Sequence, residues 1–189
     1  MKKFFNLIAV ALISISASAQ SEVGSLTWKP NVGITYSTAT GKGTDNLKGA
    51  IGLTAGVDAM YMVNEKFGAS AGLNYTGYNI STDYPSGYGV DDVIYSNYYF
   101  NIPVMGNYYV TQGLALKAGI AINILSTAKC DGHDVKDNYE STFFTIPVGA
   151  SYEINDFVLE ARYNIGVSKV GKGGDGSFNA LTFTVGYKF

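Results

Sequence analysis

The sequence predicts an all-β fold, one up-and-down barrel of eight antiparallel strands that spans a membrane. Three observations predict it. Eight segments after residue 25 alternate apolar and polar residues, as strands with two unlike faces do. Tight turns and long loops alternate between these segments. The chain is only 15% charged, against about 25% for soluble domains, but it contains 23 Gly and 15 Tyr residues.

The N-terminal segment has the pattern of an export signal. A basic start is followed by an apolar stretch from Leu7 to Ile15 and by a small-x-small site at residues 17–19. We therefore expect residues 1–19 to be a cleaved signal peptide and residues 20–189 to form the barrel domain. The apolar stretch is short for a membrane helix. A chain that spans a membrane without such a helix must close into a barrel, because its backbone N–H and C=O groups need partners within the lipid.

The expected strands and connections follow from period-2 runs and turn residues. The strands are expected at Leu26–Thr38, Gly49–Val63, Phe67–Ile80, Tyr95–Val110, Leu114–Leu125, Tyr139–Ile154, Phe157–Val167 and Phe178–Phe189. The tight turns are Asn64–Lys66, Thr111–Gly113 and Asn155–Asp156, and the long loops are Ala39–Lys48, Ser81–Ile94, Ser126–Asn138 and Ser168–Ser177. Short turns on one rim and long loops on the other are typical of outer-membrane barrels.

The first three strands carry aromatic residues near their ends and glycines on their more polar face. Trp28 and Tyr36 lie near the two ends of the first strand, and Phe67 and Tyr75 lie in the third. In the second, the face of Ile51, Leu53, Ala55, Val57 and Ala59 opposes that of Gly52, Thr54, Gly56 and Asp58. Aromatic residues at strand ends are typical of membrane interfaces.

The fifth, seventh and eighth strands show which face points inward. Each has one face without charge, and the other carries Lys117, Glu160 and Arg162 interleaved with glycines. An eight-stranded barrel has a narrow interior, which small and long side chains together can fill. On a solvated outer face the glycines would only weaken the strands. The pattern therefore favours polar-in, apolar-out packing over a soluble lipocalin-like barrel, whose apolar face points inward.

The fourth and sixth strands share an Ile-Pro-Val motif, at residues 102–104 and 146–148. Proline lacks a ladder donor, so we expect paired bulges or a local break in the sheet there. The repeat resembles the motif of the PorT-like "outer membrane protein beta-barrel domain" family, which also includes OmpX-like barrels. The end of the chain, with Tyr187 and Phe189, resembles the membrane-insertion signal read by the outer-membrane assembly machinery. The resemblance implies the fold and the cell outer membrane, but no activity.

Seven charged residues are expected to point into the barrel, where buried charges must be paired. They are Lys29, Asp58, Lys117, Glu153, Glu160, Arg162 and Lys188. We expect them to form an ion-pair network that plugs the lumen. The alternative is a narrow pore, for which eight strands leave little room.

Catalysis and metal binding have weak support. His133, the single histidine, lies in a predicted loop flanked by Ser126 and Ser141, and nothing positions it as the base of a lipid A-modifying enzyme. The aspartates of this loop lack the spacing of a calcium loop. The glycine-rich segment 171–176 precedes a strand, whereas a phosphate loop precedes a helix. Cys130 is the only cysteine and is expected to be a loop thiol.

The sequence thus predicts a non-enzymatic barrel without a cofactor, with an envelope-structural, adhesion or surface-interaction role. Loops on a rigid scaffold often carry recognition, and Tyr84, Tyr88 and Tyr95 around the second long loop are candidate contacts for a protein partner. The alternative is an accessory subunit of an export or surface-assembly complex. The other expected partners are outer-membrane lipid and lipopolysaccharide. No basic patch indicates nucleic acid.

Overall fold

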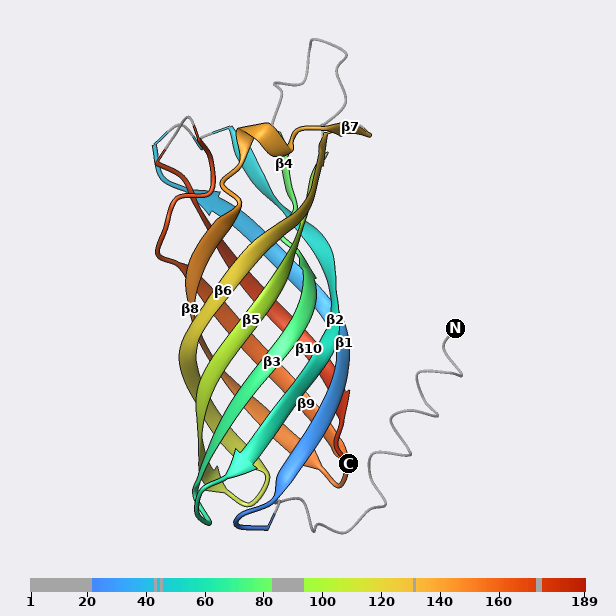
Figure 1. Cartoon of the computed structure of the whole chain (residues 1–189), viewed down its shortest axis with the longest axis vertical. Helices are drawn as coiled ribbons and strands as arrows, with labels where there is room; N and C mark the ends of the chain where they lie inside the picture. The colour runs from blue at the N-terminus through green and yellow to red at the C-terminus, as the bar shows by residue number, and fades with distance from the viewer. Residues whose placement is uncertain (1–21, 43, 45, 83–93, 131, 173–174) are drawn as a thin grey trace.

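The computed structural model describes residues 22–42, 44, 46–82, 94–130, 132–172 and 175–189. Eight long strands make the barrel, and two short ones, β4 and β7, lie at one rim (Figure 1). The long strands are β1 (Leu26–Thr40), β2 (Leu47–Met62), β3 (Phe67–Gly77), β5 (Ile94–Thr111), β6 (Leu114–Cys130), β8 (Thr142–Ile154), β9 (Phe157–Gly166) and β10 (Ser177–Tyr187). The short elements are β4 (Ile80–Thr82), β7 (His133–Asp134) and the 3₁₀ helix η1 (Lys136–Asn138).

Each long strand pairs antiparallel with its neighbours in sequence, and β1 pairs with β10 to close the ring. Backbone hydrogen bonds between Trp28 and Phe189 continue this closing ladder to the short-turn rim. The three tight turns lie at that rim, and the long connections lie at the opposite, long-loop rim (Figure 1). No helix among the described residues is long and apolar enough to span a membrane. The prediction of an eight-stranded closed barrel is confirmed.

The strand ends differ from the prediction at the long-loop rim. β6 extends to Cys130 and then pairs with β7, so the expected loop from Ser126 is largely extended backbone. β8 begins at Thr142, whereas Tyr139 was expected to start it. The predicted third strand is divided into β3 and β4, and β4 pairs with both β2 and β5. These strands are longer or divided because pairing continues above the apolar band, where the period-2 pattern fades.

The two faces of the wall are sorted as the sequence predicts. The outward side chains are large and apolar: Val32, Leu53, Ile120 and Val104 are more than half exposed. The inward side chains include buried charges and amides, among them Lys117, Glu160 and Asn123. The prediction of a polar interior is confirmed, and a lipocalin-like arrangement is excluded for this wall.

Glycines on the inner face make room for the long charged side chains. A Cβ on Gly186 would collide with the Lys29 stem, and one on Gly72 would collide with the Asp58 carboxylate. Asp58 and Gly72 are direct neighbours in the β2–β3 register. These glycines are therefore part of the lumen packing, as expected from their shared face.

The two Ile-Pro-Val prolines point inward, and each interrupts one ladder without shifting its register. The β3–β5 pairing is interrupted opposite Pro103, between Ala71↔Val104 and Asn74↔Asn101. The β6–β8 pairing is interrupted in the same way opposite Pro147. The missing proline N–H explains both gaps. Of the two sequence-based expectations, a local break is confirmed and paired bulges are wrong, because the register is the same on either side of each gap.

Candidate functional site

The middle of the lumen holds a cluster of five charged side chains around Glu160. Its Oε2 lies 2.6 Å from Lys117 Nζ and 2.8 Å from Lys29 Nζ. Its Oε1 lies 3.6 Å from Arg162 Nε. Lys29 also pairs with Asp58, at 3.1 Å. The strands place these groups together because each lies at an inward position of the ladder, on β1, β2, β6 and β9.

Neutral amides complete this cluster. Asn74 Nδ2 donates to Asp58 Oδ1 at 3.2 Å, and Asn31 Nδ2 lies 3.4 Å from Oδ2 of the same carboxylate. The guanidinium of Arg162 has fewer hydrogen-bond partners. Its Nη1 lies 3.7 Å from the Met105 sulfur, and its Nε has no hydrogen-bond acceptor. Lys29, Lys117 and Arg162 face two carboxylates, so the cluster has an excess of one positive charge.

A second charged group lies nearer the short-turn rim. Lys188 Nζ donates to Glu153 Oε2 at 2.6 Å, and the Tyr109 hydroxyl donates to Glu153 Oε1 at 2.5 Å. The cavity between the two charged groups has a volume of about 20 Å³. That is room for about one water molecule, which is far less than a continuous aqueous channel needs. The structure therefore places all seven predicted lumen charges in two ion-pair groups.

A layer of amides and hydroxyls lies above the charge cluster. On β9, the inward positions that follow Glu160 toward the long-loop rim are Arg162 and Asn164. Asn164 Nδ2 donates to Thr182 Oγ1 at 3.1 Å. On the other side of the barrel, Asn101 Nδ2 donates to Asn123 Oδ1 at 2.8 Å. Short polar side chains thus bond across neighbouring strands at this level.

An aromatic plug fills the lumen above the polar layer. It consists of Tyr78, Tyr99, Phe143 and Phe178, each at most 1% exposed. Tyr99 and Phe143 meet edge to face with centroids 4.9 Å apart, and Tyr78 and Phe143 do so at 5.3 Å. The sequence reasoning missed this plug. The signal that could have found it is an aromatic residue at the inward parity near the loop end of four expected strands.

The long-loop rim carries a collar of backbone, formed by η1, residues 139–141 and residues 167–172. Glu140 N donates to Val170 O at 2.9 Å, and Lys172 N donates to Asn138 O at 3.0 Å. An isolated bridge joins Tyr139 to Gly171. A surface ion pair between Lys169 and Asp175 spans the same connection and raises the pKa of Lys169. The collar is therefore held by its own hydrogen bonds.

The collar surrounds a pocket of about 240 Å³, here called the vestibule. Phe178, Ile80 and Val170 are buried beneath it and separate it from the lumen. Its walls are lined by Ala39, Lys42, Thr44, Leu47, Tyr95, Val135, Asn138, Tyr139, Gly171 and Gly176. Burial raises the pKa of the Tyr139 hydroxyl above its ordinary value. Lys42 is the one charged side chain among these lining residues.

The other predicted residues fall in different places. Tyr95 lines the vestibule wall, whereas Tyr84 and Tyr88 lie outside the described residues, as do residues 1–19. Tyr187 and Phe189 lie at the short-turn rim and point outward, where the ring of Tyr187 packs edge to face on Phe157 at 5.3 Å.

His133 is exposed on β7 and pairs in register with Cys130. In the described part of the chain, no hydrogen bond joins it to Ser126 or Ser141. No group of three or more potential metal ligands is found among the described residues.

The fold resembles solved eight-stranded barrels. Neisserial surface protein A superposes with a TM-score of 0.59 and 16% identity, over 86% of this chain and 97% of that one. Ail, the attachment invasion locus protein of Yersinia pestis, superposes with a TM-score of 0.52 and 16% identity, over 89% of this chain and 100% of that one. At such identity the likeness shows the fold alone. A comparison with curated protein sequences found no significant match.

The sequence profile of one family matches residues 6–189, which is nearly the whole chain. Its description, "Outer membrane protein beta-barrel domain", agrees with the closed ring, the apolar outer wall and the polar interior. The resemblance inferred from the Ile-Pro-Val repeat and the C-terminal strand is thus confirmed for the family. The chain is an outer-membrane β-barrel protein and belongs to the outer membrane protein beta-barrel domain family.

Proposed function

We propose that this barrel is non-enzymatic and acts by contact, by presenting its long-loop rim to a protein partner outside the cell. Long loops of outer-membrane barrels face outward and the short turns face the periplasm. The observation that carries the proposal is the collar, whose backbone hydrogen bonds fix an apolar vestibule above a filled lumen. A preformed pocket loses less entropy on binding than a loop that must first order.

The vestibule suits an anchoring side chain of a partner protein. Its volume of about 240 Å³ is below the roughly 300–1,000 Å³ of pockets for drug-sized ligands. Its lining is mostly aliphatic and aromatic, with Lys42, Thr44 and Asn138 as its polar side chains. Buried apolar anchors surrounded by polar contacts supply most of the binding energy in many protein interfaces.

A pull-down from outer membranes tests the contact role. The tagged barrel is extracted in mild detergent, and co-purified proteins are quantified by mass spectrometry. We expect a partner that is lost from Val135→Asp, which puts a charge on the vestibule wall, and kept by Lys66→Asp at the short-turn rim. Recovery without any protein partner, or equal recovery with both variants, would overturn the proposal.

The non-enzymatic part is supported by the position of His133, which is exposed at a hairpin tip. A His base in acyl-transfer chemistry must lie within hydrogen-bond reach of its nucleophile. We expect cells that carry His133→Ala to have the same lipid A mass profile as wild type. A profile changed to that of cells lacking the protein would show lipid A-modifying activity instead.

A further inference from the structure

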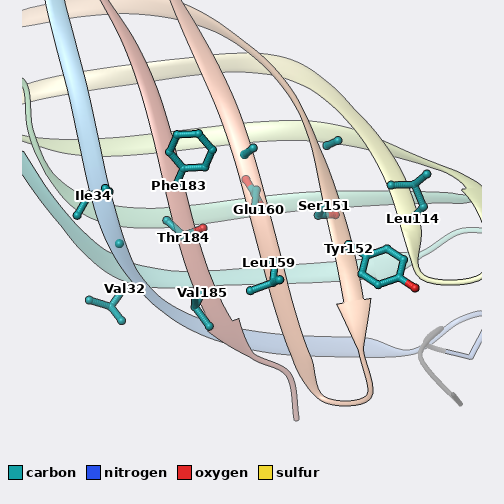
Figure 2. Close-up of a pocket in the computed structure, with 13 residues that line it drawn as sticks. Val32, Ile34, Leu114, Ser151, Tyr152, Leu159, Glu160, Phe183, Thr184 and Val185 are labelled. Carbon is teal, nitrogen blue, oxygen red and sulfur yellow. The ribbon is translucent and has the colours of Figure 1, made fainter. Parts of the chain in front are cut away.

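An apolar groove of about 550 Å³ lies on the outer wall, over β8, β9, β10 and β1 (Figure 2). Val32, Leu159 and Val185 project from its lower part in the view, and Phe183 stands beside its upper part. The walls also include Ile34, Leu114 and Tyr152. The apolar side chains of this groove have the outward parity, so they point away from the lumen. Its lining also includes, from inward positions of the same strands, Gly33, Ser151, Glu160 and Thr184.

Two neighbouring alanines make the groove. Ala150 on β8 lies directly opposite Ala161 on β9. Their outer neighbours in the same row are Leu116 on β6 and Phe183 on β10. Adjacent strands are about 4.8 Å apart, so two methyl groups form a floor about one strand spacing wide between two long side chains. The rows on either side carry Tyr152 with Leu159, and Val148 with Tyr163.

The groove lies in the half of the barrel nearest the periplasm. Tyr152 lies two residues before the end of β8, and Leu159 lies two residues after the start of β9. Phe157 and Tyr187, which meet edge to face, mark the aromatic belt just below it. The tight turns of outer-membrane barrels face the periplasm, so the acyl chains of the inner leaflet surround this part of the wall.

We propose that the groove is a lipid site that holds one acyl chain of a periplasmic-leaflet phospholipid. An empty apolar groove loses the van der Waals contacts that its lining atoms would otherwise make. A flexible chain can follow the floor of Ala150 and Ala161 and contact both walls at once. Another pocket on the outer wall, over Gly106 and Ala118, is smaller, at about 310 Å³.

A second copy of the barrel is the less suitable occupant. Apolar surface gives no hydrophobic drive for protein association within lipid, so packing must supply the energy. Two convex walls meet along a narrow strip, whereas stable interfaces bury about 1,200–2,000 Å². The alanine floor would accept one or two side chains of such a partner.

Native mass spectrometry of the barrel released from nanodiscs of palmitoyl-oleoyl phosphatidylethanolamine tests the site. The filling variant is Ala161→Phe. The matched control is Ala55→Phe, an outward alanine of β2 whose neighbours on the adjacent strands are Val32 and Tyr75. We expect one lipid retained per wild-type barrel and per control barrel at mild activation. The ratio of lipid-bound to lipid-free barrel should fall about tenfold in Ala161→Phe, which corresponds to about 1.4 kcal/mol.

Two results would overturn the proposal. Equal lipid retention by Ala161→Phe and Ala55→Phe would mean that only non-specific annular lipid is carried over. A wild-type dimer that Ala161→Phe converts to monomer would make a second copy the occupant. Both variants add a side chain on the lipid face, so unheated gel migration like that of wild type serves as the check that they fold.

Discussion

At the residue scale, Glu160 holds the charge cluster together. One carboxylate oxygen accepts from both Lys117 and Lys29, and the other faces Arg162. The side chain of Glu160 is 2% exposed, so water cannot replace these partners. Removing one member of a buried ion pair leaves an uncompensated charge in a region of low dielectric, and this costs more than the pair itself contributes.

We expect Glu160→Gln to lower the free energy of unfolding by about 3–5 kcal/mol. The amide keeps the shape of the side chain but leaves three cations facing Asp58 alone. Urea titration of the barrel refolded into lipid vesicles measures the loss. Asp137→Asn, an exposed change in η1, is the matched control and should be neutral. Adding Lys117→Met to Glu160→Gln should recover part of the loss, and no recovery would contradict the charge argument.

At the element scale, glycine and proline lie opposite each other at a crowded place on the inner wall. In the β6–β8 register the residue that faces Pro147 is Gly119. A Cβ on Gly119 would collide with the Val104 carbonyl on β5. β6 can approach β5 closely here because this position has no side chain.

Gly119→Ala should therefore destabilise the barrel by about 1–3 kcal/mol, the usual cost of overpacking. The control is Gly106→Ala on β5, whose outward Cβ would meet only the Phe67 ring at 3.4 Å. Both changes remove one glycine from a strand interior. The difference between their unfolding free energies therefore measures the cost of the collision with the Val104 carbonyl. Equal unfolding free energies in the same urea titration would show that β5 and β6 have room for the methyl group.

The ladder gaps predict a local pattern of hydrogen exchange. The amide of Gly119 on β6, opposite Pro147, should exchange faster than that of Asn123, which has the same parity in the continuous part of the same ladder. Pro147→Ala restores the donor and should slow exchange at the gap. Amide-resolved NMR in detergent micelles measures these exchange rates. Uniform exchange along β6 would mean that β6 and β8 stay paired across the proline.

At the scale of the whole molecule, two different layers of side chains close the lumen, one above the other. The charge cluster occupies the middle, and the aromatic plug lies between the polar layer and the vestibule. Either filling alone blocks water, because an eight-stranded lumen is only wide enough for side chains. The rigid filled barrel serves as a scaffold for the collar at one rim and for the lipid-facing groove on its wall.

Removing the aromatic plug should therefore not open a pore. We expect wild type and the double variant Tyr78→Ala with Phe178→Ala to show no steady conductance in planar bilayers, because the charge cluster still blocks the path. The double variant should lose stability, by about 3–5 kcal/mol for each aromatic side chain. A steady open level in the double variant would mean that the charge cluster is hydrated and leaves a continuous path.

The sequence by itself determined the strand count, the order of turns and loops, the facing of each strand and the family. These follow from a strict period of two and from turn residues such as Asn155, which adopts a positive φ of 53° in its two-residue turn. They are local properties, so no long-range contact is needed to infer them. The inward charges were found for the same reason, since parity alone identifies Glu160 and Arg162.

Only the tertiary structure decided which of those side chains meet. The partners of Glu160 come from β1 and β6, far apart in sequence, and register around a closed ring brings them together. The aromatic plug, the vestibule and the groove at Ala150 and Ala161 depend in the same way on which rows of neighbouring strands align. A period of two fixes the face of a residue but not its height on the neighbouring strand, and this height is set by turn lengths and by barrel closure.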